Sequence, residues 1–196
     1  MLKRVFDILF SVLGLTLSSP LLLLIAFLIK REDGGPVFYR GVRIGRSEKP
    51  FRIFKFRTMV VNAEELGGPS TADDDPRITK IGRWLRKYKL DELPQLINVL
   101  RSEMSFVGPR PEVQHYVDML TEKERAILNV RPGITDWASL WNPDEGAILA
   151  GSPDPEKTYM EKIRPTKIAF QLKYVKKRSF WIDLKIIVQT LLTILK

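Results

Sequence analysis

The chain has 196 residues, a formal net charge of +9 and no cysteine. The lack of cysteine excludes disulfides and thiolate metal sites, and the single histidine, His115, excludes a histidine-rich metal centre. A basic excess of this size favours anionic partners such as lipid head groups, nucleotides or nucleic acid. The length fits one globular domain together with a membrane segment.

An uncharged apolar run extends from residue 8 to residue 29. Lys3 and Arg4 precede it, and Lys30 and Arg31 follow it. The run is long enough to cross a bilayer, for which a helix needs roughly 20 apolar residues. Basic flanks prefer the cytoplasm, and a simple span would place one basic pair on the wrong side. The pattern therefore favours a helix that enters the bilayer and returns, over a kinked spanning helix or a cleaved signal peptide.

Ser19 and Pro20 mark the break in this predicted hairpin. Proline lacks an N–H, and its ring clashes with the carbonyl one turn earlier. The hydroxyls of Ser18 and Ser19 can satisfy backbone groups that the proline frees. Residues 8–17 and 21–29 each form about 15 Å of helix, which is roughly half of the hydrocarbon core. The sequence thus predicts a re-entrant segment.

Short strands follow the apolar run. Residues 37–39 and 51–56 are predicted strands around a turn region at 41–50. The second of these strands partly alternates aromatic and basic side chains. This alternation fits either a half-buried strand with a solvated basic face or a basic face against phosphates, including lipid head groups.

Helical patterns dominate the rest of the chain, which predicts a mostly α fold with a short β-hairpin. We expect a re-entrant membrane hairpin over residues 1–31 and a small globular domain with interfacial amphipathic helices over 32–196. The predicted elements after the hairpin are a polar loop at 62–75, helices at 78–90, 93–100 and 112–129, a loop at 142–155, and an apolar helix at 180–196 that is either a core helix or an interfacial one.

Asp91 and Glu92 lie between the basic stretch and the next predicted helix. With Pro94 in the first turn, they fit a capped helix start in which Asp91 is the N-cap. The same geometry fits catalysis, because a helix N-terminus attracts phosphate and favours the charged form of a carboxylate, which keeps Asp91 a competent nucleophile. Two neighbouring carboxylates also suit Mg²⁺, and nearby cations such as Arg86 screen an anionic substrate. Both interpretations stay open on these residues alone.

Arg110 stands between Pro109 and Pro111 in a predicted loop. Two prolines reduce the entropy of placing one guanidinium, which can grip a phosphate with two hydrogen bonds. A rigid helix-entry turn with a solvated arginine is the alternative. The chain lacks the patterns GxxxxGK[ST], GxGxxG, GxSxG and HExxH, which argues against a P-loop NTPase, a Rossmann dehydrogenase, a serine hydrolase and a zinc peptidase.

A series of ordered motifs carries a resemblance to a known family. The motifs are Lys3-Arg4-Val5-Phe6-Asp7, Ser19-Pro20, Pro36-Val37-Phe38-Tyr39-Arg40, Phe54-Lys55-Phe56-Arg57-Thr58-Met59, residues 90–96, 98–101, 104–111 and 131–135, Tyr174-Val175, and residues 179–183. Through them the chain resembles, nearly end to end, the small monotopic phosphoglycosyl transferases of bacterial polyprenol-linked glycan assembly. Each motif alone is unspecific, whereas their order together is highly specific.

The resemblance implies a two-step reaction. Asp91 attacks the β-phosphate of a UDP-sugar and displaces UMP, and a polyprenol phosphate, in bacteria undecaprenyl phosphate, then takes up the phosphosugar. Glu92 helps to place Mg²⁺, so that Asp91 and Glu92 form the metal-binding pair. The resemblance also identifies five further residues as phosphate or substrate contacts: Lys55, Arg57, Arg86, Arg110 and Pro111.

The resemblance also implies where the protein works. The family's hairpin corresponds to residues from about Lys3 to Lys30, and its active site faces the cytoplasm at the bacterial inner membrane. The expected partners are the UDP-sugar, the polyprenol phosphate and the bilayer, without nucleic acid, and a homodimer is left open. The expected role is the first membrane step of glycan assembly, as in exopolysaccharide biosynthesis.

Several residues depart from the family pattern. They lie at 135–141, in the segment 142–158 and at Gln171, where members often have an acidic residue. We expect Trp137, Trp141 and the loop that follows them to shape the sugar or nucleotide pocket, and the identity of the sugar stays open. The alternative to an enzyme is a non-enzymatic basic membrane-associated protein that binds anionic lipid or nucleic acid, and UMP release distinguishes the two.

Overall fold

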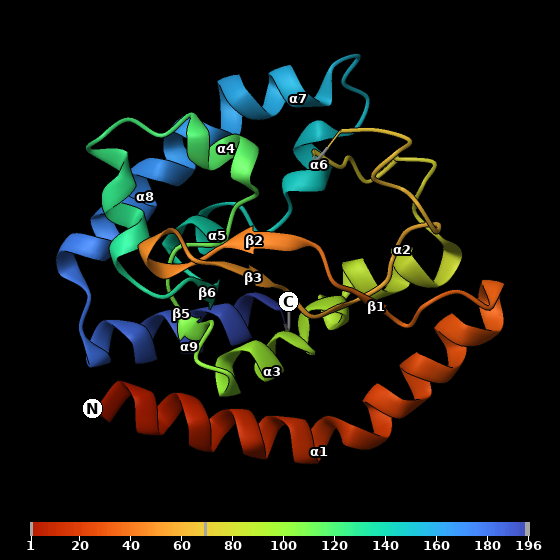
Figure 1. Cartoon of the computed structure of the whole chain (residues 1–196), viewed down its shortest axis with the longest axis horizontal. Helices are drawn as coiled ribbons and strands as arrows, with labels where there is room; N and C mark the ends of the chain where they lie inside the picture. The colour runs from red at the N-terminus through yellow and green to blue at the C-terminus, as the bar shows by residue number, and fades with distance from the viewer. Residues whose placement is uncertain (1, 69, 195–196) are drawn as a thin grey trace.

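The computed structural model describes residues 2–68 and 70–194. The described part of the chain is mostly helical and contains three two-stranded sheets, as Figure 1 shows. The elements are α1 (Leu2–Asp33), β1 (Phe38–Tyr39), β2 (Val42–Ile44), a 3₁₀ turn (Arg46–Glu48), β3 (Pro50–Arg52), β4 (Lys55–Phe56), α2 (Lys80–Lys87), a 3₁₀ turn (Leu90–Glu92), α3 (Gln95–Leu100), β5 (Ser105–Val107), α4 (Gln114–Asp118), a 3₁₀ segment (Glu124–Asn129), β6 (Gly133–Thr135), α5 (Trp137–Trp141), α6 (Glu145–Leu149), α7 (Pro155–Thr158), a π-helical turn (Tyr159–Ile163), α8 (Arg164–Lys177) and α9 (Phe180–Ile194). The predicted predominance of helix with a short β-hairpin is confirmed.

Helix α1 runs along one edge of the molecule and bends in its middle (Figure 1). It continues through Pro20 without interruption. The Ser19 hydroxyl donates to the carbonyl of Thr16 at 2.8 Å, which is the carbonyl that Pro20 leaves without its helical donor, and the Ser18 hydroxyl donates to Gly14 at 2.6 Å. The predicted break is therefore a bend, because the two hydroxyls compensate locally for the proline.

The first half of α1 is tied to the globular part by buried polar contacts. Asp7 is only 2% exposed, and it accepts hydrogen bonds from the Ser105 hydroxyl at 3.1 Å and the Phe106 amide at 3.3 Å. Lys3 donates to Asp183 of α9 at 2.5 Å and to the Val107 carbonyl at 2.9 Å. These contacts fix α1 beside β5 and α9 despite its apolar composition.

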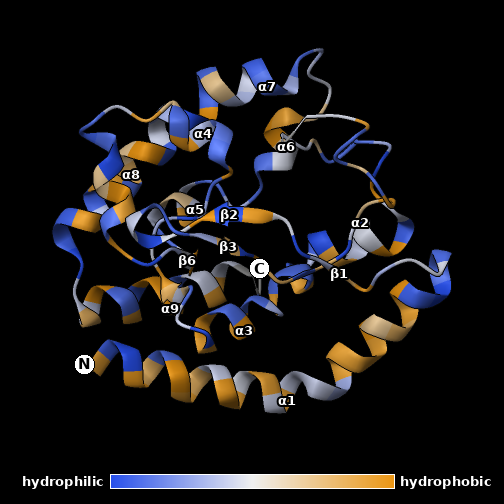
Figure 2. Cartoon of the chain, in the orientation of Figure 1, coloured by the Kyte–Doolittle hydropathy of each residue, from blue (hydrophilic) through white to orange (hydrophobic). Residues whose placement is uncertain are grey.

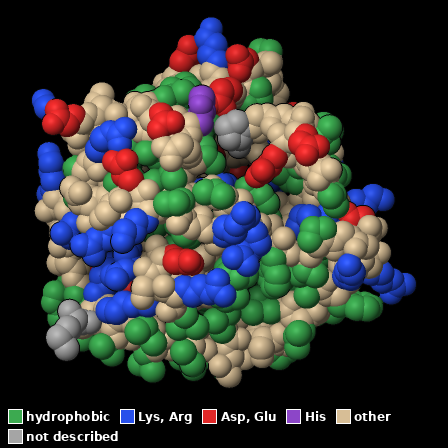
Figure 3. Space-filling view, viewed as in Figure 1, with side chains coloured by type: hydrophobic (Ala, Val, Ile, Leu, Met, Phe, Trp, Pro, Cys, Tyr) green, Lys and Arg blue, Asp and Glu red, His purple; other side chains and the backbone are tan. Residues whose placement is uncertain are grey.

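The second half of α1 is held by apolar packing, and most of the remaining surface of the helix is exposed. Ile25 and Ile29 are buried against Phe56 and Leu85. In the described residues, α1 is the one helix that is long and apolar enough, by length and composition, to cross a membrane. Figure 2 shows its hydrophobic residues, and Figure 3 shows hydrophobic side chains gathered along this edge with Lys and Arg side chains next to them. Most acidic side chains in that view lie on the opposite half of the molecule.

The predicted hairpin region contains two small antiparallel sheets. Strand β1 pairs with β4, and β2 pairs with β3. The prediction of a single strand at 51–56 is wrong, because this segment divides between β3 and β4, and β2 lies inside the expected turn region at 41–50. A third sheet pairs β5 with β6 in parallel, with Ser105 opposite Gly133, and the sequence did not predict it. Gly133 is required there, because a Cβ atom at this position would lie 2.1 Å from the Gly108 nitrogen. This close approach fixes the loop that follows β5.

Two further predicted elements are wrong. The single helix expected at 112–129 ends at Asp118 and restarts as a 3₁₀ segment. The restart has a capping exchange, in which the Thr121 amide donates to Glu124 at 2.8 Å and the Glu124 amide donates to the Thr121 hydroxyl. The loop expected at 142–155 contains α6 and the start of α7, because Asp144 and Asp154 each cap a helix start.

Helix α9 packs one face into the core and exposes the other, so its predicted core role is confirmed and its interfacial role stays a prediction. Ile186 is buried in a core cluster with Val107 and Tyr174, whereas Trp181 is 77% exposed. Part of the predicted C-terminal helix, Leu195 and Lys196, lies outside the described residues, as does Met1 of the predicted hairpin. The predicted polar loop at 62–75 has no helix or strand in its described residues.

Candidate active site

The predicted carboxylate pair lies in the turn between α2 and α3. Lys89 adopts a left-handed backbone conformation (φ 55°), which ends the path of α2 and opens the 3₁₀ turn that holds Asp91 and Glu92. Helix α3 starts at Gln95 with Pro94 at its N-cap position. The predicted N-cap role of Asp91 is therefore wrong, because Asp91 belongs to a separate turn before the helix.

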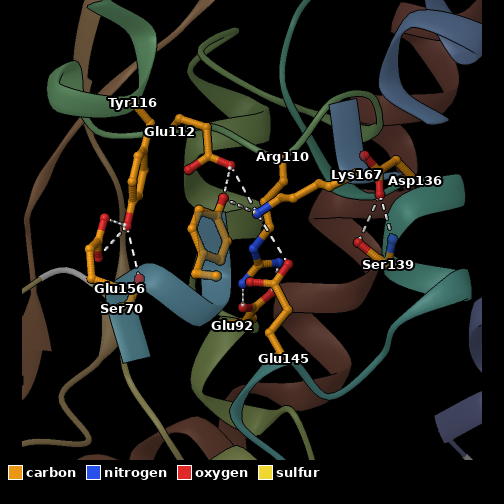
Figure 4. Close-up of polar contacts among 11 residues, drawn as sticks. Ser70, Glu92, Arg110, Glu112, Tyr116, Asp136, Ser139, Glu145, Glu156 and Lys167 are labelled. Atoms are coloured by element: carbon orange, nitrogen blue, oxygen red, sulfur yellow. Dashed lines mark hydrogen bonds and ion pairs between the residues drawn. The ribbon is translucent and has the colours of Figure 1, made fainter. Parts of the chain in front are cut away.

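Glu92 is held by two cations from distant parts of the chain. Lys55, from β4, donates to Oε1 at 2.9 Å. Arg110, from the loop after β5, pairs with both carboxylate oxygens, and its Nη1 donates to Oε2 at 3.2 Å (Figure 4). Burial favours the neutral form of Glu92, but the charges of Arg110 and Lys55 outweigh it and hold the pKa of Glu92 well below its usual range. Glu92 is thus a fixed carboxylate.

Asp91 has a different environment from its neighbour. It is buried, and burial raises the pKa of its carboxyl group, while the charge of Lys55 opposes this rise. The sequence argument expected a helix N-terminus to favour the charged form, and that expectation is wrong because desolvation dominates. Within the described residues no salt bridge holds Asp91. Its carboxylate is therefore not committed to a protein cation.

The structure brings most of the predicted basic residues to this pair. Lys55 and Arg110 contact Glu92 directly. Arg86 donates to the Thr58 hydroxyl at 3.0 Å, and its charge lowers the pKa of Asp91. Pro111 is buried next to Arg110, and both residues line a small cavity beside the loop after β5.

Arg57 has other partners. Its two terminal nitrogens donate to Asp33 at 2.6 and 2.5 Å, and its Nε donates to the Pro36 carbonyl at 2.6 Å. Arg57 thus clamps the end of α1 to β4. Its predicted contact with phosphate stays a prediction, and in this structure its guanidinium is already committed.

The comparison with known families covers the whole chain: residues 1–196 match the family described as bacterial sugar transferase. The chain belongs to this family. It is 39% identical to a UDP-N-acetylgalactosamine-undecaprenyl-phosphate N-acetylgalactosaminephosphotransferase of Aeromonas hydrophila, over 99% of this chain and 44% of the relative. It is 39% identical to an undecaprenyl-phosphate glucose phosphotransferase of Komagataeibacter xylinus, over 96% of this chain and 35% of the relative.

A third relative matches over most of both chains. The exopolysaccharide production protein ExoY of Sinorhizobium fredii is 37% identical, over 96% of this chain and 83% of the relative. By contrast, the chain spans less than half the length of the two relatives described above. The predicted family resemblance is confirmed. The names of the first two relatives refer to different sugars, N-acetylgalactosamine and glucose.

A second group of charges lies next to Arg110, and sequence reasoning missed it. The buried Lys167 of α8 pairs with Glu112 at 2.9 Å and with Glu145 at 3.1 Å (Figure 4). The charge of Glu92 raises the pKa of Arg110 most, and Glu145 and Glu112 raise it further. No local pattern identified Lys167, because a lysine and a glutamine one turn apart in the sequence also fit a solvated helix face, although both are buried in α8.

Trp137 and Trp141, the tryptophans predicted to shape the pocket, lie at the junction of α5 with α8 and α9. Trp137 packs edge-on against Tyr174, with ring centroids 6.2 Å apart, and it borders the cluster of Val107 and Ile186. Trp141 lies 6.0 Å from the ring of Phe170. The predicted pocket role of these tryptophans stays a prediction, since the contacts that the structure gives them belong to the core and to α8.

The described residues contain no group of three or more His, Asp or Glu side chains arranged to hold a metal ion. Mg²⁺ does not need such a group, because it usually binds through one or two carboxylates together with substrate phosphates. The oxygen donors of Asp91 and Glu92 fit this chemistry. Lys55 and Arg110 both donate to Oε1 of Glu92, whereas Oε2 accepts from Arg110 alone, so Oε2 keeps a lone pair that could coordinate an ion.

Proposed function

We propose that the chain transfers a sugar phosphate from a UDP-sugar to a polyprenyl phosphate, such as undecaprenyl phosphate, and releases UMP. The observation that carries the proposal is the buried carboxylate of Asp91, which has no salt-bridge partner among the described residues. It lies beside Glu92, whose carboxylate is held by Lys55 and Arg110. Membership in the bacterial sugar transferase family supports it. So do the relatives, whose names describe undecaprenyl-phosphate sugar phosphotransferases.

The proposed reaction has two displacement steps. In the first, an Asp91 oxygen bonds to the β-phosphorus, and the bond from that phosphorus to the bridging oxygen breaks, so that UMP leaves with the electron pair. In the second, a phosphate oxygen of the polyprenyl phosphate attacks the same phosphorus, and the bond to Asp91 breaks. The products are a polyprenyl-diphosphate sugar and the regenerated carboxylate.

The cations around the pair have a clear part in this chemistry. A carboxylate and a diphosphate repel each other, and Lys55, Arg86 and Arg110 lie close enough to influence the charge of Asp91. Arg110 can present its planar group to phosphate oxygens as well as to Glu92. Mg²⁺, when bound at Asp91 and Glu92, supplies charge neutralisation on the diphosphate.

We further propose that α1 is a re-entrant membrane element, and that the active site faces the cytoplasm at the bacterial inner membrane. Basic residues flank both ends of the apolar run, and α1 bends near Pro20. A monotopic arrangement lets a soluble nucleotide sugar and a lipid-borne phosphate meet at one carboxylate. The reaction would be the first membrane step of polyprenol-linked glycan assembly.

UMP release tests the proposed activity directly. The purified protein in lipid nanodiscs is mixed with undecaprenyl phosphate, Mg²⁺ and one of three donors: UDP-glucose, UDP-galactose or UDP-N-acetylgalactosamine. We expect UMP from at least one donor, its loss on addition of EDTA, and its loss in Asp91→Asn. The exposed Glu161→Gln is the matched control. If the wild-type protein releases UMP from none of the three donors but binds anionic vesicles, the non-enzymatic lipid-binding alternative is favoured.

The topology has an independent test, because the chain contains no cysteine. Single variants Leu2→Cys and Arg31→Cys place one thiol at each end of α1. We expect a membrane-impermeant maleimide to label both from the cytoplasmic side only. Labelling of the two thiols from opposite sides would show a spanning helix instead.

A further inference from the structure

The sugar of the donor must lie close to Asp91 in the proposed reaction, because it is attached to the phosphorus that Asp91 attacks. This inference therefore rests on the proposed function. Phosphate oxygens are anionic and seek cations, whereas sugar hydroxyls are neutral and pair well with carboxylates. A carboxylate that borders the phosphate-binding cations, but is not one of the reacting pair, is thus suited to the sugar.

Glu145, the first residue of α6, has this position. Figure 4 shows Glu92 and Glu145 converging on the guanidinium of Arg110. The electrostatic effects agree with this arrangement. The charge of Glu145 raises the pKa of Arg110, and the charge of Glu92 raises the pKa of Glu145. Glu145 is therefore a neighbour of Arg110 and Glu92, although it comes from a distant segment.

The carboxylate of Glu145 is fixed but still reachable. Its Oε1 lies 3.1 Å from the Nζ of Lys167, whose side chain is only 6% exposed, while the Glu145 side chain is 35% exposed. Burial favours the neutral form of Glu145, but the charges of Lys167 and Arg110 outweigh it and lower its pKa. Glu145 thus presents a charged acceptor toward solvent from a buried anchor.

The backbone around Glu145 is held in place. The Asp73 amide donates to the Gly146 carbonyl at 3.2 Å, and the Gly151 amide donates to the Asp74 carboxylate at 3.1 Å. A Cβ atom at Gly146 would lie 2.1 Å from Asp73 Oδ1, so a larger residue here would displace the Asp73 side chain. Figure 3 shows the surface hollowed beside this region, with acidic side chains next to the opening.

We propose that Glu145 accepts hydrogen bonds from hydroxyl groups of the donor's sugar and thereby helps to select among UDP-sugars. Lys167 acts as a positioning residue, because it fixes one oxygen of Glu145 and leaves the other for the ligand. The ribose of the nucleotide carries the same hydroxyl chemistry. The experiment therefore separates sugar from ribose.

The test compares donors with nucleotides that lack the sugar. For wild type, Glu145→Gln, Glu145→Asp and the control Glu161→Gln, kcat/KM is measured with UDP-glucose, UDP-galactose and UDP-N-acetylgalactosamine, and inhibition constants are measured with UDP and UMP. We expect Glu145→Gln to lower kcat/KM for the preferred donor about tenfold or more, as the loss of one hydrogen bond to a charged group does. We expect the ratio between the glucose and galactose epimers to narrow and the inhibition constants to change less than about twofold.

Other outcomes overturn the inference. An equal loss for UDP and for the UDP-sugars assigns Glu145 to the ribose, and an unchanged epimer ratio removes it from sugar selection. Glu145→Asp keeps the negative charge beside Lys167 but shortens the side chain. If this variant changes the ratio of kcat/KM between UDP-glucose and UDP-galactose at an unchanged melting temperature, the effect comes from sugar recognition and not from folding. A wild type that releases UMP from no donor overturns the proposed function itself, whereas a normal wild type with unaffected Glu145 variants overturns this inference alone.

Discussion

Two regions of the molecule meet at Arg110, and they differ in how openly the sequence shows their chemistry. The first, residues 90–111, carries its functional groups in recognisable motifs. In the second, residues 137–158, the conspicuous tryptophans pack against α8 and the core, while an ordinary glutamate reaches the site. The difference teaches that a motif reports chemistry best where the backbone around it is locally constrained.

The constraint in the first region is visible in the loop after β5. Gly108 donates to the Thr135 carbonyl at 3.1 Å, and Gly133 donates to the Pro109 carbonyl at 3.0 Å. With prolines on both sides, Arg110 has little freedom except in its side chain. The sequence near Glu145 contains no comparable motif that would predict where its side chain points. The position of its carboxylate depends on Lys167, which belongs to a later helix.

The largest effect that separates the two regions is expected at the nucleophile. Asp91→Asn should lower the rate of UMP release by at least about 10³-fold, because the amide cannot form the covalent intermediate. Steady-state UMP release measures this loss. A variant that keeps full turnover would remove Asp91 from the chemistry and leave the first region without its proposed role.

Arg110→Met should have the next largest effect. It removes the bidentate partner of Glu92 and a candidate phosphate contact, so we expect kcat to fall about 10²-fold with the membrane-bound fraction unchanged. Arg110→Lys should restore only part of the activity, because an ammonium cannot form the planar fork. Equal kcat values for wild type and Arg110→Met would mean that the two regions do not meet at a functional residue.

Arg57→Met tests whether Arg57 belongs to the site or to the clamp on α1. The structure predicts a modest loss of stability of about 1 kcal/mol, because only the Arg57 end of the pair is buried and the Asp33 carboxylate that remains is exposed to solvent. The KM for the UDP-sugar should stay near the wild-type value in the folded fraction. Thermal unfolding in detergent and steady-state kinetics measure the two quantities. A raised KM at unchanged stability would instead support the predicted phosphate contact.

Trp137→Phe should give the smallest effect. Its contacts with Tyr174 predict a packing loss of about 1 kcal/mol and an unchanged preference among UDP-sugars. The melting temperature and the donor panel report these two outcomes. A changed sugar preference would support the pocket role expected from the sequence and weaken the contrast with Glu145.

Local patterns predicted much of the fold, but they failed where distant or capping contacts decide. The long N-terminal helix, the basic helix before Asp91 and strand β1 follow from local periodicity. The β5–β6 pairing joins segments far apart in the chain, which no local pattern records. The capping exchange of Thr121 with Glu124 divides a segment whose apolar spacing alone suggests one helix.

The site shows the same division. Asp91, Glu92, Lys55 and Arg110 were identified from residue type and from the family resemblance, and the structure brings them together. The electrostatic state of Asp91 was not predictable, because burial depends on the packing of the whole domain. Lys167 was hidden for the same reason, since a buried lysine looks like a surface lysine until its partners are known.

The most direct test of the central claim is the intact mass of the protein after incubation with a UDP-sugar and Mg²⁺ in the absence of polyprenyl phosphate. The account predicts an added mass equal to one sugar phosphate, located on Asp91, absent in Asp91→Asn and discharged when undecaprenyl phosphate is added. UMP release that needs undecaprenyl phosphate from the start, without any covalent adduct on the wild-type protein, would contradict it.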